Sequence, residues 1–194
     1  MLSLRESHSN NMKFSKEFLE GKKYFIFDMD GTLLDSLRYW RSFDWSKTTI
    51  AEANEVLRPH YLLDVVPRVG TLEALAEFKK MGIRIGIATA TDIDVCSDGF
   101  ERMGIGKYID VAMCEKDVGK GKSDPTLYLT CLERLGGTIN EFVIFEDRLY
   151  AATCAKKAGF SVVGILDSWN SEEEHEALSR LCDAVVVDLR ELLI

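Results

Sequence analysis

Two aspartates, Asp28 and Asp30, follow the apolar segment 24–27 and precede Gly31. On a strand, side chains two residues apart share a face, so both carboxylates can point at one ligand. Two such charges repel each other unless a cation or a shared proton intervenes, and a divalent metal with oxygen ligands satisfies both. The alternative is an ordinary turn with a solvated carboxylate, and an isolated Asp-x-Asp does not decide between the two.

A second acidic pair, Glu146 and Asp147, follows the apolar segment 142–145. Buried charges are costly unless they are paired, so a buried strand seldom ends in adjacent carboxylates without a metal or a basic partner. A surface turn is the alternative. The pair therefore adds a second candidate for metal binding at a strand end.

A hydroxyl and a cation complete the set of candidate functional groups. Thr89 ends the apolar segment 83–89, where a hydroxyl and free backbone N–H groups can bind phosphoryl oxygens, although threonine is also a favoured helix N-cap. Lys122 lies just before an expected helix, where its charge opposes the helix dipole and calls for a nearby anion. A solvated loop lysine is the alternative, and Lys120 competes for the same role.

The elements that must position these residues alternate between strands and helices. We expect helices at 71–81, 93–103, 124–135, 149–158 and 172–181, and strands at 24–27, 83–89, 109–113, 142–145, 160–165 and 184–187. This alternation predicts an α/β fold with a parallel sheet covered on both faces. Ligand sites in such sheets lie beyond the carboxyl ends of the strands, where all the candidate residues occur.

The chain divides into three predicted parts. Residues 1–22 are expected to form a mobile polar tail over 1–11 and a short helix over 14–21, and residues 23–35 with 67–194 form the α/β core. Residues 36–66 form an insertion with two helices. Thr49 and Glu52 form a predicted capping box at the start of the second helix, and Pro59 is expected to end it.

The first part of the insertion carries an aromatic stripe, formed by Tyr39, Trp40, Phe43 and Trp45. Two helices cannot enclose a core of their own. The stripe must therefore pack on the core domain or on another chain, since large exposed apolar patches usually mark interfaces. The first option is slightly favoured over a homodimer contact.

Composition excludes several classes of protein. The 194 residues are 46% apolar, and a net charge of −8 with a pI near 5.0 provides no basic surface for nucleic acid or an anionic membrane. The five cysteines are odd in number and scattered without a Cys-x-x-Cys motif, which favours a reducing compartment. No apolar run approaches the ~20 residues that span a bilayer. We expect a soluble, cytoplasmic protein.

The candidate residues, taken together, resemble four motifs of the haloacid dehalogenase superfamily. The string 28–32, Asp-Met-Asp-Gly-Thr, is similar to the first motif of its phosphatase and β-phosphoglucomutase branch, and Thr89 matches the second. Lys122 matches the lysine of the third motif, Lys-Pro-x-Pro, although Ser123 replaces its first proline. Glu146 and Asp147 resemble the fourth motif in its Glu-Asp form.

The resemblance implies a fold and a mechanism. The fold is a three-layer α/β/α Rossmann-like sheet with a small helical cap at 36–66. Asp28 would be the nucleophile and Asp30 the general acid and base, while Thr89, Ala90 and Lys122 bind the phosphoryl group. The ligands of Mg²⁺ would be Asp28, the Asp30 carbonyl, Asp147 and Glu146. The implied reaction is hydrolysis of a small-molecule phosphomonoester through an aspartyl-phosphate.

Two alternatives follow from the same resemblance. A sugar phosphomutase of the β-phosphoglucomutase kind carries a histidine soon after the first motif, and the matching residue here is Trp40, which disfavours that activity. A non-enzymatic binding protein would have no reason to retain mutually repelling carboxylates. Because the cap is so short, we expect no four-helix bundle over Asp28 and a more open active site.

Overall fold

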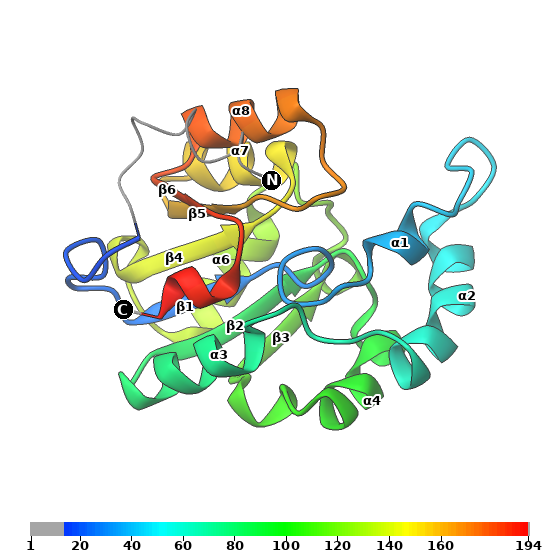
Figure 1. Ribbon diagram of the computed structural model, residues 1–194, viewed down its shortest axis with the longest axis horizontal. Helices are drawn as coiled ribbons and strands as arrows, with labels where there is room; N and C mark the ends of the chain where they lie inside the picture. Colours follow the sequence, from blue (N-terminus) through cyan, green and yellow to red (C-terminus); the bar gives the residue numbers. More distant parts are fainter. Residues whose placement is uncertain (1–13, 194) are drawn as a thin grey trace.

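Six parallel strands form the centre of the molecule, in the order β3-β2-β1-β4-β5-β6 (Figure 1). The computed structural model describes residues 14–193. The strands are β1 (Tyr24–Phe27), β2 (Arg84–Thr89), β3 (Val111–Cys114), β4 (Phe142–Glu146), β5 (Ser161–Ile165) and β6 (Ala184–Val186). Each strand pairs in parallel with its neighbours, which confirms the predicted α/β fold.

The connections between the strands are mostly helical. The α-helices are α1 (Leu37–Trp40), α2 (Ile50–Leu63), α3 (Thr71–Lys80), α4 (Ile93–Met103), α5 (Glu115–Val118), α6 (Thr126–Leu135), α7 (Leu149–Lys157) and α8 (Glu172–Leu181). Short 3₁₀ segments are η1 (Gly106–Tyr108), η2 (Ile139–Glu141) and η3 (Leu189–Leu192). None of the helices in the described part of the chain is both long and apolar enough to cross a membrane.

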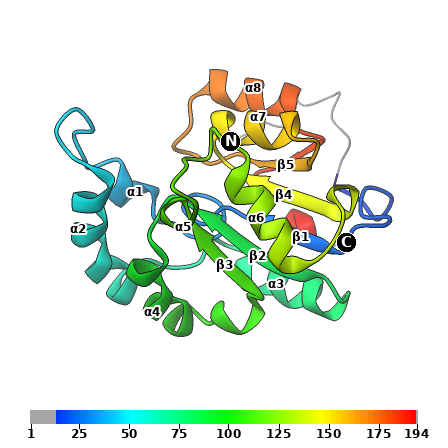
Figure 2. The ribbon, with the colours of Figure 1, turned by 180° about the vertical axis from the view of Figure 1, so that it is seen from behind.

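Alternate residues of the central strands fill two separate cores. Phe25 and Phe27 of β1 belong to the core shared with α3 and α4, whereas Ile26 belongs to the core shared with α6, α7 and α8. Figures 1 and 2, which view the sheet from opposite sides, show helices on both of its faces. Because both faces are covered, β1 and β4 are apolar at successive positions rather than at every second one.

The segment before β1 departs from its prediction. Residues 14–21 form a series of turns instead of a helix, with one helical bond from the Leu19 N–H to the Ser15 carbonyl at 3.2 Å. The ring of Phe14 packs 6.2 Å from that of Phe145, and this contact with the core outweighs the weak helical preference of so short a segment. Residues 1–11, predicted to be a mobile tail, lie outside the described range.

The insertion at residues 36–66 contains α1 and α2 and lies at the carboxyl end of the sheet (Figure 1). Thr49 and Glu52 form the predicted capping box, but the prediction that Pro59 ends the helix is wrong, since α2 continues to Leu63. Inside a helix, proline removes one backbone donor and crowds the carbonyl four residues earlier. The buried side chains of Leu57 and Tyr61, one on each side of Pro59, hold the helix against the core across that gap.

The aromatic stripe of the insertion does not occupy one helix, because α1 ends at Trp40. Tyr39, Trp40 and Phe43 are partly buried against the core that contains Phe25, so they pack on their own chain. Trp45 remains 47% exposed and stacks on Trp40 with ring centroids 5.8 Å apart. A homodimer contact through this region stays a prediction.

Candidate active site

The order of the strands brings the sequence-predicted residues together. Strand β1 lies between β2 and β4, so Asp28, Thr89 and Glu146 emerge at adjacent strand ends. The Asp28 N–H donates to the Phe145 carbonyl at 2.9 Å, which continues the β1–β4 pairing to the nucleophile candidate. The backbone at this position is therefore held by the sheet itself.

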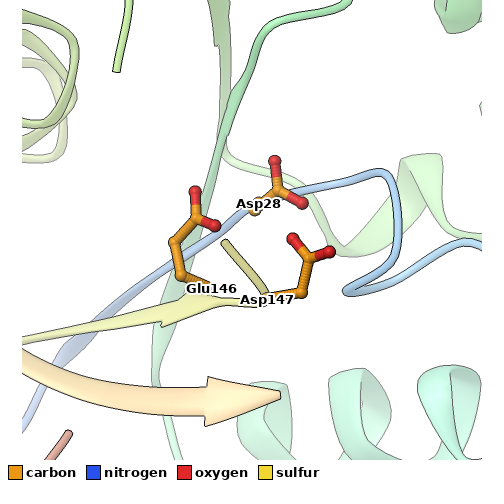
Figure 3. Close-up of side chains that lie close together, drawn as sticks. All are labelled: Asp28, Glu146 and Asp147. Carbon is orange, nitrogen blue, oxygen red and sulfur yellow. The ribbon is translucent and has the colours of Figure 1, made fainter. Parts of the chain in front are cut away.

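Three buried carboxylates form a cluster beyond these strand ends. Asp28, Glu146 and Asp147 each offer an oxygen within 4.8 Å of the others, and Figure 3 shows their side chains converging. Burial raises the pKa of Asp147 well above its usual range, and the charges of Asp28 and Glu146 raise it further. Burial likewise raises the pKa of Glu146. The raised pKa values mean that the ionised forms of Glu146 and Asp147 are less favourable here than in water.

Close packing around Asp147 depends on a glycine. Gly31 has a φ of +89°, and a Cβ there would lie 2.6 Å from Asp147 Oδ2. Any side chain would therefore collide with the carboxylate as well as adopt an unfavourable backbone conformation. This explains the glycine that follows the two aspartates in the sequence.

Lys122 is the cationic partner within the cluster. Its ammonium is buried and donates to Asp28 Oδ1 and, at 2.6 Å, to Glu146 Oε1. Burial acts to lower the pKa of Lys122, but the Asp28 and Glu146 carboxylates outweigh it and raise that pKa well above its ordinary value. Lys120, its competitor in the sequence, is exposed.

The carboxylate oxygens of the cluster differ in how well they are satisfied. Glu146 accepts hydrogen bonds from Lys122 and from Tyr128 at 3.0 Å on one oxygen, and from the Arg148 N–H at 3.1 Å on the other. In contrast, Asp28 Oδ2 and both oxygens of Asp147 are buried without a hydrogen-bond partner. Such oxygens are costly unless a cation binds them. They fit a hard divalent cation such as Mg²⁺.

The carboxylate of Asp30 lies outside this cluster and is held by three hydroxyl groups. Ser36 donates to its Oδ1 at 2.5 Å, Tyr61 to the same oxygen at 2.6 Å, and Thr91 to Oδ2 at 2.6 Å. Burial and the charge of Asp28 raise the pKa of Asp30, while the three hydroxyl donors oppose that increase. A raised pKa favours a carboxyl group that can carry a proton for transfer.

Sequence reasoning missed Tyr61, which comes from helix α2 of the insertion. Its hydroxyl donates to Asp30 and accepts from Trp40 Nε1 at 3.0 Å. Tyr61 reaches Asp30 because α2 packs on α4 at Gly99, where a Cβ would lie 2.5 Å from the Tyr61 carbonyl. Thr91 could have been suspected from its place two residues after Thr89, but no sequence signal identifies Tyr61.

The remaining predicted residues line a common cavity. Thr89 is fully buried, and its Oγ1 accepts from the Thr91 N–H at 3.1 Å. A cavity of about 650 Å³ opens over this region, and its lining consists of Asp28, Asp30, Leu37, Trp40, Arg41, Trp45, Ile50, Thr89, Ala90, Lys122, Arg148, Tyr150 and Glu174. The cavity thus joins the two acidic centres to side chains of the insertion. Two helices, rather than a four-helix bundle, form the insertion beside it.

Comparisons with known proteins agree on one family. Residues 45–165 match the family model for haloacid dehalogenase-like hydrolases. Over 102 residues, which are 52% of this chain and 47% of the relative, the sequence is 35% identical to a phosphorylated carbohydrates phosphatase from Thermotoga maritima. Over 123 residues, or 63% of this chain and 55% of the relative, it is 28% identical to a validoxylamine A 7'-phosphate phosphatase from Streptomyces hygroscopicus. The chain spans about half the length of these two relatives.

Solved structures share the fold over nearly the whole chain. A candidate β-phosphoglucomutase from Thermotoga maritima superposes with a TM-score of 0.71 at 25% identity, and the match covers 88% of this chain and 97% of that one. The three-layer architecture described above is therefore the one found in these structures.

Proposed function

This chain belongs to the haloacid dehalogenase-like hydrolase family, and we propose that it is a Mg²⁺-dependent phosphatase that hydrolyses small-molecule phosphomonoesters through an aspartyl-phosphate on Asp28. One observation carries this proposal. The Asp28 carboxylate is paired with the Lys122 ammonium on one oxygen and has no partner on the other, at the base of a cavity of about 650 Å³. The two relatives described above are both phosphatases, which supports the same reaction class.

The first half of the proposed reaction transfers the phosphoryl group to the protein. A carboxylate oxygen of Asp28 attacks phosphorus, the bond from phosphorus to the leaving oxygen breaks, and Asp30 gives its proton to that oxygen. Lys122 and Thr89, which both line the cavity, would stabilise charge on the phosphoryl oxygens in this reaction. The hydroxyls of Ser36, Tyr61 and Thr91 hold the Asp30 carboxyl group in place throughout.

The second half regenerates the protein. Water attacks phosphorus, its proton passes to Asp30, and the bond from phosphorus to Asp28 breaks to release inorganic phosphate. Asp28, Asp147 and Glu146 with the Asp30 carbonyl would hold Mg²⁺, and the hydrogen bonds on Glu146 make Asp147 and Asp28 the main contributors. Bound Mg²⁺ supplies charge neutralisation, so that an anionic phosphoester can approach an anionic nucleophile.

A phosphomutase is the second candidate, because one solved structure that this chain resembles is a candidate β-phosphoglucomutase. Trp40 disfavours it. Trp40 occupies the place where a mutase of that kind carries a histidine, and its Nε1 is committed to the Tyr61 hydroxyl. An indole offers no basic atom to exchange protons with a sugar hydroxyl.

A phosphate-release screen tests the proposal. The full chain is incubated with Mg²⁺ and a panel of sugar phosphates, nucleotides, small phosphoesters and an aryl phosphate, and the Asp28→Asn variant serves as the control. We expect Mg²⁺-dependent phosphate release by the wild type and none by the variant. Inactivity across the whole panel, including the aryl phosphate, would favour a binding protein with the same fold.

A further inference from the structure

Two arginines from separate segments of the chain, Arg41 and Arg148, line the cavity. Arg41 follows helix α1 of the insertion, whereas Arg148 follows the acidic pair at the end of β4. Both guanidinium groups donate to the same acceptor, Asn170 Oδ1, at 3.5 Å from Arg41 and 3.4 Å from Arg148. The structure therefore brings two like charges to one neutral oxygen.

The acceptor that gathers the two arginines is rigidly placed. Asn170 is 7% exposed, and its amide nitrogen donates to the Asp147 carbonyl at 2.9 Å. This bond directs Oδ1 toward the arginines and anchors it to the backbone of the acidic cluster. Arg41 is further oriented by the ring of Trp169, whose centroid lies 5.7 Å from the guanidinium carbon.

Neither arginine forms an ion pair with a carboxylate of residues 14–193. Elsewhere in the described chain, by contrast, Arg68 pairs with Asp167 and Arg190 with Asp188. Glu174 also lines the cavity, but one of its oxygens accepts the Ser171 N–H in the capping box of α8. The two guanidinium groups thus keep donors that no anion of the described chain uses.

From this geometry, and on the basis of the phosphatase function proposed above, we infer that Arg41 and Arg148 form a subsite for a second anionic group of the substrate. A guanidinium group presents parallel N–H donors that match a carboxylate or a phosphate, and two of them facing one point favour such an anion strongly. The substrate class is therefore a phosphomonoester that carries another phosphate or a carboxylate. The cavity volume of about 650 Å³ suits a molecule of sugar size.

Matched substrate pairs test the subsite. One pair is fructose 1,6-bisphosphate with fructose 1-phosphate, and the other is 3-phosphoglycerate with glycerol 3-phosphate. For each pair the measured quantity is the ratio of kcat/KM for the doubly charged compound to that for the singly charged one. We expect a ratio well above one for at least one pair, and the pair that shows it distinguishes phosphate from carboxylate.

Substitution of the arginines should remove this preference. In Arg41→Ala and in Arg148→Ala the ratio should fall about tenfold, the size expected when a charged hydrogen bond is lost. Arg38→Ala is the matched control, because Arg38 lies on helix α1, which Arg41 directly follows, but it donates to the Tyr39 hydroxyl at 2.8 Å and does not line the cavity. Its ratio should equal that of the wild type.

The outcomes separate this inference from the proposed function. If the wild type hydrolyses an aryl phosphate but shows a ratio near one for both pairs, the phosphatase stands and the anion subsite is wrong. A ratio that falls equally in Arg38→Ala would overturn the subsite as well, because it would indicate a general effect of surface charge. If no phosphoester is hydrolysed at all, the proposed function itself fails.

Discussion

Lys122 shows how much of the site depends on single residues. The sequence predicts that either Lys120 or Lys122, in the same glycine-rich loop, contacts the phosphoryl group. The two side chains have different surroundings in the structure. Lys122 is 2% exposed and bonded to Asp28 and Glu146, whereas Lys120 points to solvent. The separation follows from the loop conformation, in which Glu115 accepts the Lys122 N–H at 2.8 Å.

This contrast gives a prediction for the two lysines. Lys122→Ala should lower kcat by about 10²-fold or more, the cost of removing a positioned donor to the transition state. Lys120→Ala should leave kcat near the wild-type value because its side chain touches none of the site residues. Steady-state phosphate release by the purified variants measures both, and the reverse ranking would mean that the loop is assigned wrongly by two residues.

Site residues that are positioned by tertiary packing could not be predicted from sequence patterns. The acidic residues, Thr89 and Lys122 could be predicted because each follows an apolar strand or belongs to a short linear pattern. Tyr61 and Asn170 could not, since each reaches the site from an element whose position depends on contacts far away in the chain. Local patterns identify strand ends, but they do not report which helix covers them.

At the scale of elements, the packing of α2 on α4 places Tyr61 of the insertion against the Asp30 carboxylate. Gly99 permits the approach, and Arg102 of α4 donates to the carbonyl of Tyr61 at 3.2 Å and to that of Val65. The same docking explains why α2 passes through Pro59: the helix is held by packing on both sides of the missing donor. Sequence rules for helix ends consider the chain alone and therefore ended the helix too early.

Gly99→Ala should disturb both stability and catalysis. The added methyl group would lie 2.5 Å from the Tyr61 carbonyl, so α2 must move, and overpacking of this kind costs about 1–3 kcal/mol. The shift should also move the Tyr61 hydroxyl away from the Asp30 carboxylate, and kcat should fall because Asp30 loses one of the groups that hold it. Thermal unfolding and phosphate release measure the two effects.

A neighbouring substitution provides the control for Gly99→Ala. Asp98 is on the same helix and exposed, so Asp98→Ala should change neither the unfolding temperature nor kcat appreciably. If Gly99→Ala is as stable and as active as Asp98→Ala, helix α2 does not position Asp30 in the manner described.

At the scale of the whole molecule, the buried carboxylates link stability to pH and to Mg²⁺. The pKa values of Asp30, Glu146 and Asp147 are raised in the folded state, so these three groups bind more protons in the folded protein without metal than in the unfolded chain. That contribution to stability is fully present below the unfolded pKa values, about 4, and is lost as pH rises through the folded values. A bound cation competes with these protons.

Mg²⁺ should therefore stabilise the protein more at high pH than at low pH. We expect the increase in Tm on adding saturating Mg²⁺ to be larger at about pH 8 than at about pH 5, as differential scanning calorimetry can measure. Asp147→Asn should abolish most of this difference, because both Asp147 oxygens lack a protein partner. An equal increase at both pH values in the wild type would contradict a cation site at this cluster.

The overall architecture was largely accessible from the sequence. Six buried strands alternating with amphipathic helices specify a parallel sheet, and covered faces explain the uniform apolar content of β1 and β4. The turns at residues 14–21 were missed because they are stabilised by the contact of Phe14 with the core rather than by local preference. The pairing of Arg41 with Arg148 was also missed, because it depends on contacts of both side chains with Asn170, which is distant from Arg41 in the sequence.

Direct capture of the intermediate tests the central claim that Asp28 is phosphorylated. The wild-type protein is mixed with a hydrolysed phosphomonoester and Mg²⁺, quenched in acid within one turnover, digested, and analysed by mass spectrometry. We predict one phosphoryl group on Asp28 in the peptide that contains it, and none in Asp28→Asn. Phosphate release without any phosphorylated peptide, or with the phosphoryl group on another residue, would contradict the mechanism.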